Sequence, residues 1–181
     1  MSMLRNAAAG VALATFGFAS AASAATTDSA DVQAEILTAL SVAVVAADDT
    51  LDFGTIADGG ITANANLTVG TNGALVACPA NLICGGTTNA PTFDIDGLAT
   101  LLVDVSFTNA TETLSHPAPA LYPTMVTTLS AGAFTTSLVG NQATLNATGD
   151  ASFTVGGTLT VAPNQAPGVY TGSVTVEVAY N

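Results

Sequence analysis

Few side chains in this sequence are able to do chemistry: it contains one histidine and two cysteines. A histidine acts as a general base only beside a nucleophile and an orienting acid. His116 instead lies among prolines in the stretch from Ser115 to Pro123, which we predict to be an exposed loop. A Gly-x-Ser-x-Gly nucleophile elbow is absent from the sequence. We therefore predict a protein that is not an enzyme, with no catalytic residue and no cofactor.

The two cysteines, Cys78 and Cys84, are close together in the sequence. In an oxidising compartment such a pair is most simply a disulfide that closes a local loop, and it stabilises the fold by about 2 kcal/mol. A zinc site needs further Cys or His ligands at short spacing, which the single His116 does not supply. The pair therefore predicts a structural disulfide and an oxidising compartment.

The acidic residues offer two weak metal motifs. Asp94 to Gly97 (Asp-Ile-Asp-Gly) resembles part of a calcium loop, but a third spaced acid and a terminal Glu are missing, and a buried Ile95 would explain the alternation as well. Asp48, Asp49 and Asp52 form the densest acidic cluster, at a place where a solvated turn before a strand is the simpler interpretation. We predict no metal site.

The charge balance excludes several classes of function. The chain of 181 residues has 13 acidic residues and one basic residue, which is Arg5. Binding to a nucleic-acid backbone depends on Lys and Arg that neutralise phosphates. The sequence therefore predicts no nucleic-acid partner, and it offers no polybasic segment for anionic lipid.

The N-terminus has the pattern of a secretory signal peptide in residues 1–24. Arg5 precedes an apolar stretch from Ala7 to Ala19, and Ala22-Ser23-Ala24 forms an A-x-A cleavage site. The mature chain would begin at Ala25 and contain no Lys or Arg. The later apolar run from Ile36 to Ala47 is too short to span a bilayer, so we expect an exported chain without a membrane span after cleavage.

The elements that position these residues are predicted to be strands. Apolar and polar residues alternate over 61–69, 92–96 and 101–107, and weaker runs cover 125–129, 143–147, 152–155 and 158–161. Glycine-rich turn signals separate the runs, Gly156-Gly157 among them. Short strands at this spacing predict an all-β sandwich.

Apolar and polar residues also alternate at both ends of the mature chain. At the N-terminal end the apolar positions of one parity are Val32, Ala34, Ile36, Leu40, Val42 and Val44. At the C-terminal end one face of the predicted last strand holds Tyr170, Gly172, Val174, Val176, Val178 and Tyr180. An apolar strand edge invites pairing with another chain, and this mature chain has no Lys to protect such an edge.

The C-terminal pattern resembles the terminal motif of chaperone-usher pilus subunits, with Gly168 fourteenth from the end and Tyr180 penultimate. In addition, residues 51–56, 156–159 and 168–172 resemble a group of secreted proteobacterial β-domains of unassigned function. The first resemblance implies an immunoglobulin-like β-sandwich that lacks one strand. A periplasmic chaperone would supply that strand temporarily before the N-terminal extension of the next subunit replaces it, with an outer-membrane usher as a further partner.

On that resemblance, residues 25–44 are the extension that contains the donor strand, residues 45–181 are the pilin-like sandwich, and Gly168 with the C-terminal face lines the acceptor groove. The predicted protein is an exported homopolymer in a surface fimbria that supports cell adhesion or biofilm. The alternative is a monomeric secreted or periplasmic binding domain whose sandwich is complete, with its first and last strands paired inside one molecule.

Overall fold

The computed structural model describes residues 28–181, so the predicted signal peptide and its cleavage site lie outside the described residues. The chain divides into two units, of which the second is Ile36–Asn181. In the first unit, residues 28–35 have neither helix nor strand and are exposed. The strands all belong to the second unit.

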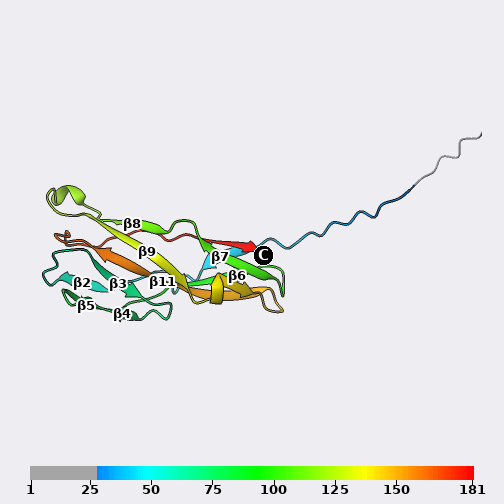
Figure 1. Cartoon of the computed structure of the whole chain (residues 1–181), viewed down its shortest axis with the longest axis horizontal. Helices are drawn as coiled ribbons and strands as arrows, with labels where there is room; N and C mark the ends of the chain where they lie inside the picture. The colour runs from blue at the N-terminus through cyan, green and yellow to red at the C-terminus, as the bar shows by residue number, and fades with distance from the viewer. Residues whose placement is uncertain (1–27) are drawn as a thin grey trace, which may run out of the picture. The chain divides into compact units, whose positions relative to one another are not determined.

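That unit is built almost entirely from antiparallel strands (Figure 1). Its elements are β1 (Ser41–Val44), β2 (Thr55–Asp58), β3 (Ala65–Val69), β4 (Leu75–Ala77), β5 (Leu82–Gly85), β6 (Thr92–Asp96), β7 (Leu102–Phe107), β8 (Thr111–Ser115), the 3-10 turn η1 (Pro119–Leu121), β9 (Thr128–Thr136), the 3-10 turn η2 (Val139–Asn141), β10 (Gln142–Thr144), β11 (Asp150–Val161) and β12 (Val176–Tyr180). The prediction of an all-β sandwich is confirmed.

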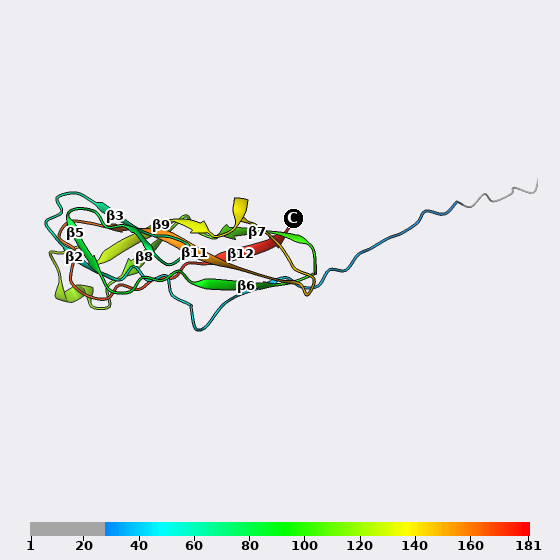
Figure 2. The same cartoon turned by 90° about the horizontal axis from the view of Figure 1, so that it is seen from below.

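The largest sheet is organised around the long strand β11. Its first half pairs with β6, which in turn pairs with β1. Its second half pairs with β3 and β9, and these pair with β4 and β8. A second sheet has the order β10-β7-β12, and β2 pairs with β5 in a separate two-stranded sheet (Figures 1 and 2).

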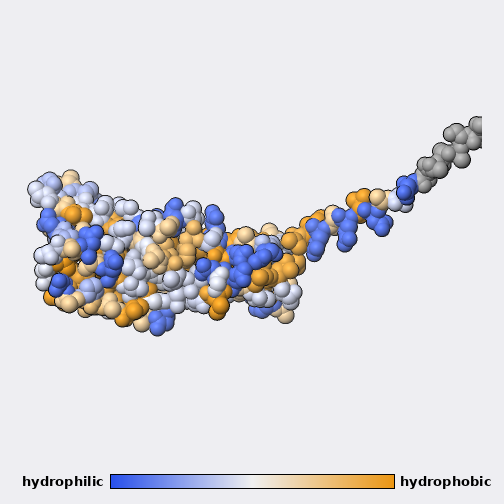
Figure 3. Space-filling model, in the orientation of Figure 1, coloured by the Kyte–Doolittle hydropathy of each residue, from blue (hydrophilic) through white to orange (hydrophobic). Residues whose placement is uncertain are grey.

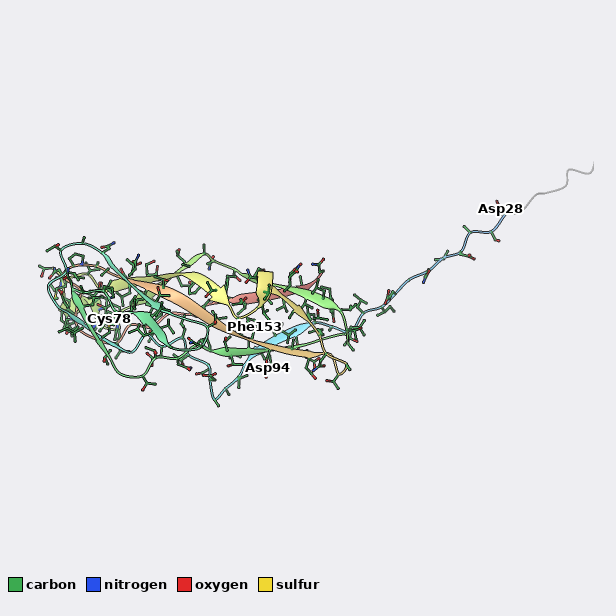
Figure 4. All side chains as sticks on the ribbon, turned by 60° about the horizontal axis from the view of Figure 1, so that its bottom comes forward. Asp28, Cys78, Asp94 and Phe153 are labelled. Atoms are coloured by element: carbon green, nitrogen blue, oxygen red, sulfur yellow. A yellow bond between two sulfur atoms is a disulfide. The ribbon has the colours of Figure 1, made fainter. Side chains whose placement is uncertain are left out.

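Two apolar clusters fill the sandwich, because alternate residues of each strand point inward. The first cluster lies around β3, β9 and the second half of β11, and includes Leu67, Val69 and Leu159. The second cluster lies between β1, β6 and the first half of β11 on one side and the β10-β7-β12 sheet on the other; Phe153 is one of its members. Phe153 is buried, whereas Asp94 on the neighbouring strand is exposed (Figure 4).

The prediction of a turn at Gly156-Gly157 is wrong, because β11 runs through both glycines without a break. A Cβ atom on Gly156 would lie 2.7 Å from the Val69 carbonyl oxygen, and one on Gly157 would lie 3.0 Å from the ring of Phe134. The two glycines are needed for close packing inside the sheet, not for a reversal of the chain.

The terminal strands are shorter than the alternation predicts. β1 covers only Ser41–Val44 of the run that starts at Val32, and β12 covers only Val176–Tyr180. The compact unit begins at Ile36, so it includes β1, which the predicted boundary between residues 44 and 45 assigned to the extension. Among residues 28–181, no helix is long and apolar enough to cross a membrane.

Candidate functional site

The two ends of the chain form adjacent strands with free edges. β1 contacts β12, yet the two strands share no ladder of hydrogen bonds. Among the described strands, β1 pairs only with β6, and β12 pairs only with β7. The two sheets of the sandwich therefore end side by side, each with an unpaired edge.

An apolar cavity of about 290 Å³ opens next to these edges. We call it the terminal groove. Its lining comes from the end of β1 and the residues after it, from β6, β8 and β9 and the residue before β6, and from the segment before β12. The residues that line it are Val44, Asp49, Thr50, Leu51, Phe53, Pro91, Phe93, Glu112, Leu114, Ala131, Phe134, Gly172, Ser173 and Val174.

Two backbone segments that line the terminal groove have hydrogen-bonding groups without a backbone partner among the described residues. Residues 49–51 lie between Asp48 and the bridge that joins Asp52 to Asn89, and residues 172–174 lie between the Thr171–Ser115 bridge and Thr175. Neither segment makes a hydrogen bond to another described backbone group, although the Thr50 carbonyl accepts one from the Asn89 side-chain amide at 3.1 Å. Free backbone groups beside an apolar cavity are what an added extended peptide requires.

Strand β9 contributes Ala131 and Phe134 to the lining of the groove. Phe134 of β9 lies over Gly157 of β11, where any side chain would collide with the Phe134 ring and with Leu51. Phe134 also contacts Phe107 of β7, with ring centroids 5.5 Å apart. Because Gly157 has no side chain, Phe134 and Leu51 are able to pack next to it at the terminal groove.

Carboxylates of Asp49 and Glu112 line the groove, and residues 28–181 contain no Lys or Arg to pair with them. The neighbouring Asp48 is held by the hydroxyl of Thr92, 2.6 Å away, and by the side-chain amide of Asn89. These two donors stabilise the carboxylate and lower the pKa of Asp48. Asp48 thereby ties the chain after β1 to the start of β6, which fixes one wall of the groove.

The predicted acceptor residues divide into three groups in the structure. Only Gly172 and Val174 line the terminal groove. Val176, Val178 and Tyr180 belong to the second core cluster, where every second residue faces inward as the alternation predicts. Gly168 and Tyr170 lie beside His116.

His116 is buried, which corrects the prediction that it belongs to an exposed loop. Its Nδ1 accepts a hydrogen bond from the Ala118 N–H at 3.0 Å, so the ring proton is on Nε2, which donates to the Pro167 carbonyl at 3.1 Å. The rings of Tyr122 and Tyr170 pack edge-on against the imidazole. Both ring nitrogens are thus used to hold the proline-rich loop to the chain around residue 167.

The same histidine explains why position 168 requires a glycine. A Cβ atom on Gly168 would lie 2.1 Å from His116 Nε2, and its φ of +154° is in the range that favours glycine. The Tyr170 hydroxyl donates to the Ala166 carbonyl at 2.7 Å and accepts from the Gln165 amide at 2.8 Å. Gly168 and Tyr170 therefore hold the loop before the groove and do not line it.

The predicted donor residues also lie in different environments in the structure. Val42 pairs with Ile95 and Val44 with Phe93 inside the same chain, and Leu40 packs against the second core cluster. Val32 and Ile36 are 96% and 95% exposed. Apolar and polar side chains alternate along residues 31–36, as the colours in Figure 3 show. Among the predicted donor residues, Val32, Ala34 and Ile36 belong to neither a strand nor a core cluster.

The predicted disulfide is confirmed: Cys78 and Cys84 are joined, with their Cα atoms 6.0 Å apart (Figure 4). The bond closes the connection from β4 to β5. Within residues 28–181, no group of three or more His, Cys, Asp or Glu side chains is arranged to hold a metal ion.

Sequence reasoning missed most of the groove lining, in particular Leu51, Leu114 and Phe134. Leu114 is on β8, a strand that the sequence analysis did not predict. Leu114 is the one apolar residue of this strand, so apolar–polar alternation gives no signal for it.

The fold and the groove define the class only in outline: a β-sandwich of antiparallel sheets, with one local disulfide and free edges at β1 and β12. The sequence is more specific. Residues 43–180 match the family described as "Domain of unknown function (DUF4402)", and the chain belongs to this family. The matched region begins inside β1 and ends at the last residue of β12. Neither a curated protein nor a solved structure matched the chain.

Proposed function

We propose that the protein is a structural subunit of a surface fimbria, in which the N-terminal segment of one copy inserts as a strand into the terminal groove of another. The supporting observation is the combination of a cavity of about 290 Å³ with two segments, residues 49–51 and 172–174, whose backbone groups have no described backbone partner. An inserted strand would pair with these backbone groups and cover the free edges of β1 and β12. Main-chain hydrogen bonds would supply affinity, and the cavity would select side chains.

The donor would be the part of the mature chain before Thr38. If Val32, Ala34 and Ile36 point into the groove, Asp31, Gln33 and Glu35 point outward, because successive side chains of a strand alternate. That orientation keeps the acidic residues of the donor away from the apolar lining. It also leaves the carboxylates of Asp49 and Glu112 at the groove as the nearest like charges.

The cellular role follows from the resemblance and from the predicted signal peptide. The subunit would be exported through the periplasm, held there by a chaperone, passed to an outer-membrane usher and assembled at the cell surface. The filament would support adhesion or biofilm. With no basic side chain after Arg5, subunits cannot form side-chain ion pairs with one another, so strand insertion would hold the filament together.

The test is a charge placed inside the groove. Val174→Asp puts a carboxylate into the half-buried lining, and Thr175→Asp puts the same charge on the exposed neighbour outside it. We expect Val174→Asp to abolish filaments in electron micrographs of expressing cells, because an unpaired buried charge costs several kcal/mol. Thr175→Asp should assemble normally.

Thermal melting of both purified variants separates an assembly defect from unfolding. A folded Val174→Asp variant that forms normal filaments would exclude the terminal groove as the acceptor. Loss of filaments in both variants would indicate a general charge effect and would also contradict the proposal.

One observation favours the alternative, a monomeric secreted or periplasmic binding domain. β1 pairs with β6 in the same chain, and both core clusters are already filled by residues of that chain. Under this alternative the mature protein stays monomeric at all concentrations. Removal of residues 25–37 then changes neither its oligomeric state nor its affinity for a ligand.

A further inference from the structure

Glu112 is an acidic residue at a core-facing position of β8. Glu112 and Leu114 are half-buried, whereas the other three residues of the strand are exposed. Glu112 pairs with Ala131 of β9, and residues directly opposite each other in an antiparallel pair lie on the same face of the sheet. Ala131 is buried in the first core cluster and lines the terminal groove, as Glu112 does. A carboxylate therefore occupies a position of β8 that faces the apolar side of the sheet.

Among residues 28–181, the Glu112 carboxylate has no basic side chain to pair with. The Asn109 side-chain amide, which is uncharged, donates a hydrogen bond to Glu112 Oε1 at 2.9 Å. The chain has no Lys or Arg after Arg5, and both ring nitrogens of His116 bond to backbone groups. On the other elements that line the groove, β9 and residues 172–174 have no ionisable side chain, and the acidic residues are Asp48, Asp49 and Asp52 after β1, and Asp94 and Asp96 on β6. Of these five, only Asp49 lines the groove together with Glu112.

We propose that the charge of Glu112 opposes strand insertion at neutral pH and that protonation of this carboxylate favours it. The proposal rests on the proposed function, because it concerns the regulation of the same groove. In the isolated chain the Glu112 side chain is only half-buried, so water still solvates its charge. An inserted strand would replace that water by apolar side chains, and a carboxylate in such surroundings takes up a proton more readily. Inward-pointing charges are one means by which proteins protect a strand edge from pairing.

Strand insertion is therefore linked to proton uptake. Under the proposed function the acids of the donor, Asp31 and Glu35, point outward, so Glu112 and Asp49 are the carboxylates that the inserted strand covers. Asp49 is exposed in the isolated chain, and we assign it the smaller share. Because protons bind more tightly to the assembled form than to the monomer, the association constant should rise as the pH falls.

The experiment compares Glu112→Gln with Asp150→Asn in the mature chain. Glu112→Gln removes the charge and retains an oxygen that accepts from the Asn109 amide. Asp150→Asn removes one charge from an exposed position of β11, a strand that does not line the groove and is separated from β1 by β6. Sedimentation velocity gives the association constants at about pH 7 and about pH 4 in about 0.15 M salt, where the screening length is about 8 Å. Thermal melting at both pH values shows that the variants are folded.

We expect Glu112→Gln to raise the association constant at about pH 7 by at least about tenfold over the unmodified chain, because an unpaired carboxylate in apolar surroundings is strongly unfavourable. The ratio of the two constants should fall towards one at about pH 4, where the unmodified chain is able to carry the proton itself. Asp150→Asn should give a ratio close to one at both pH values. Glu112→Thr is a second uncharged variant, with a residue that suits a strand, and should behave as Glu112→Gln does.

A ratio for Glu112→Gln that does not change with pH would overturn the inference, and so would a ratio equal to that of Asp150→Asn. If neither the unmodified chain nor Glu112→Gln assembles at either pH, the proposed function fails and the inference fails with it. The two failures are distinguishable, because the first is observed in chains that assemble and the second in chains that do not.

Discussion

Ile36 provides the most quantitative test of strand insertion. Its side chain is 95% exposed in the isolated chain, so nearly all of its apolar surface becomes newly buried if it enters the groove of another copy. Ile36→Ala removes three carbon groups, each of which contributes about 0.8 kcal/mol when buried. The expected loss is about 2.4 kcal/mol per contact, or about 50-fold in the association constant.

The assay is the concentration dependence of assembly, followed by sedimentation velocity on the mature chain. Gln33→Ala is the matched control, because Gln33 is exposed on the same segment but has the opposite parity and points away from the groove under the proposal. Ile36 belongs to neither core cluster, so the melting temperature should not change. Equal association constants for Ile36→Ala and the unmodified chain would refute the reasoning, and so would an equal loss in Gln33→Ala.

Four further predictions concern stability and conditions. Gly168→Ala should lower the free energy of unfolding by about 1–3 kcal/mol through overpacking against His116, and His116→Ala in the same chain should recover part of the loss; chemical denaturation of the single and double variants checks this. Replacing Cys78 and Cys84 by Ser should cost about 2 kcal/mol in the same assay, the loop-closure value for a sequence separation of 6, and should leave assembly intact. The lowered pKa of Asp48 means that its contribution to stability is present above its ordinary value of 3.8 and is lost as the pH falls through the lower folded value. The stability difference between the unmodified chain and Asp48→Asn should therefore shrink below about pH 4, whereas a constant difference in acid titrations followed by circular dichroism would contradict that assignment. Assembly should become easier as salt rises from about 0.1 M to about 1 M, because the screening length falls from about 10 Å to about 3 Å between chains that carry 13 acidic residues each, and light scattering at several salt concentrations measures this.

The alternation of apolar and polar residues predicted those strands that have one buried face. β6 lies where it was expected, and β7 differs from the predicted run only at Leu101. The alternation failed at Gly156-Gly157, where two glycines allow close packing inside β11. A turn and a close contact both require glycine, and the sequence does not distinguish them without knowledge of Val69 and Phe134 across the sheet.

The groove could be predicted only in part, because its lining comes from segments far apart in the chain. Gly172 and Val174 were found from the C-terminal pattern, but the pattern did not reveal that Val176 is buried in the second core cluster and that Gly168 packs against His116. His116 was predicted to be exposed because prolines surround it. Its burial depends on two backbone partners, Ala118 and Pro167, of which the second is remote in the sequence.

The most direct test of strand insertion is amide hydrogen exchange on the mature chain, compared between the dilute monomer and the assembled form. The backbone groups at residues 172–174, which make no hydrogen bond to other described backbone groups, should exchange quickly in the monomer and slowly after assembly. Val32 to Ile36 should gain protection in parallel, and Ala120 and Leu121 of η1 should not change. Fast exchange at residues 172–174 in the assembled form would contradict the account, and so would protection of Val32 to Ile36 already present in the monomer.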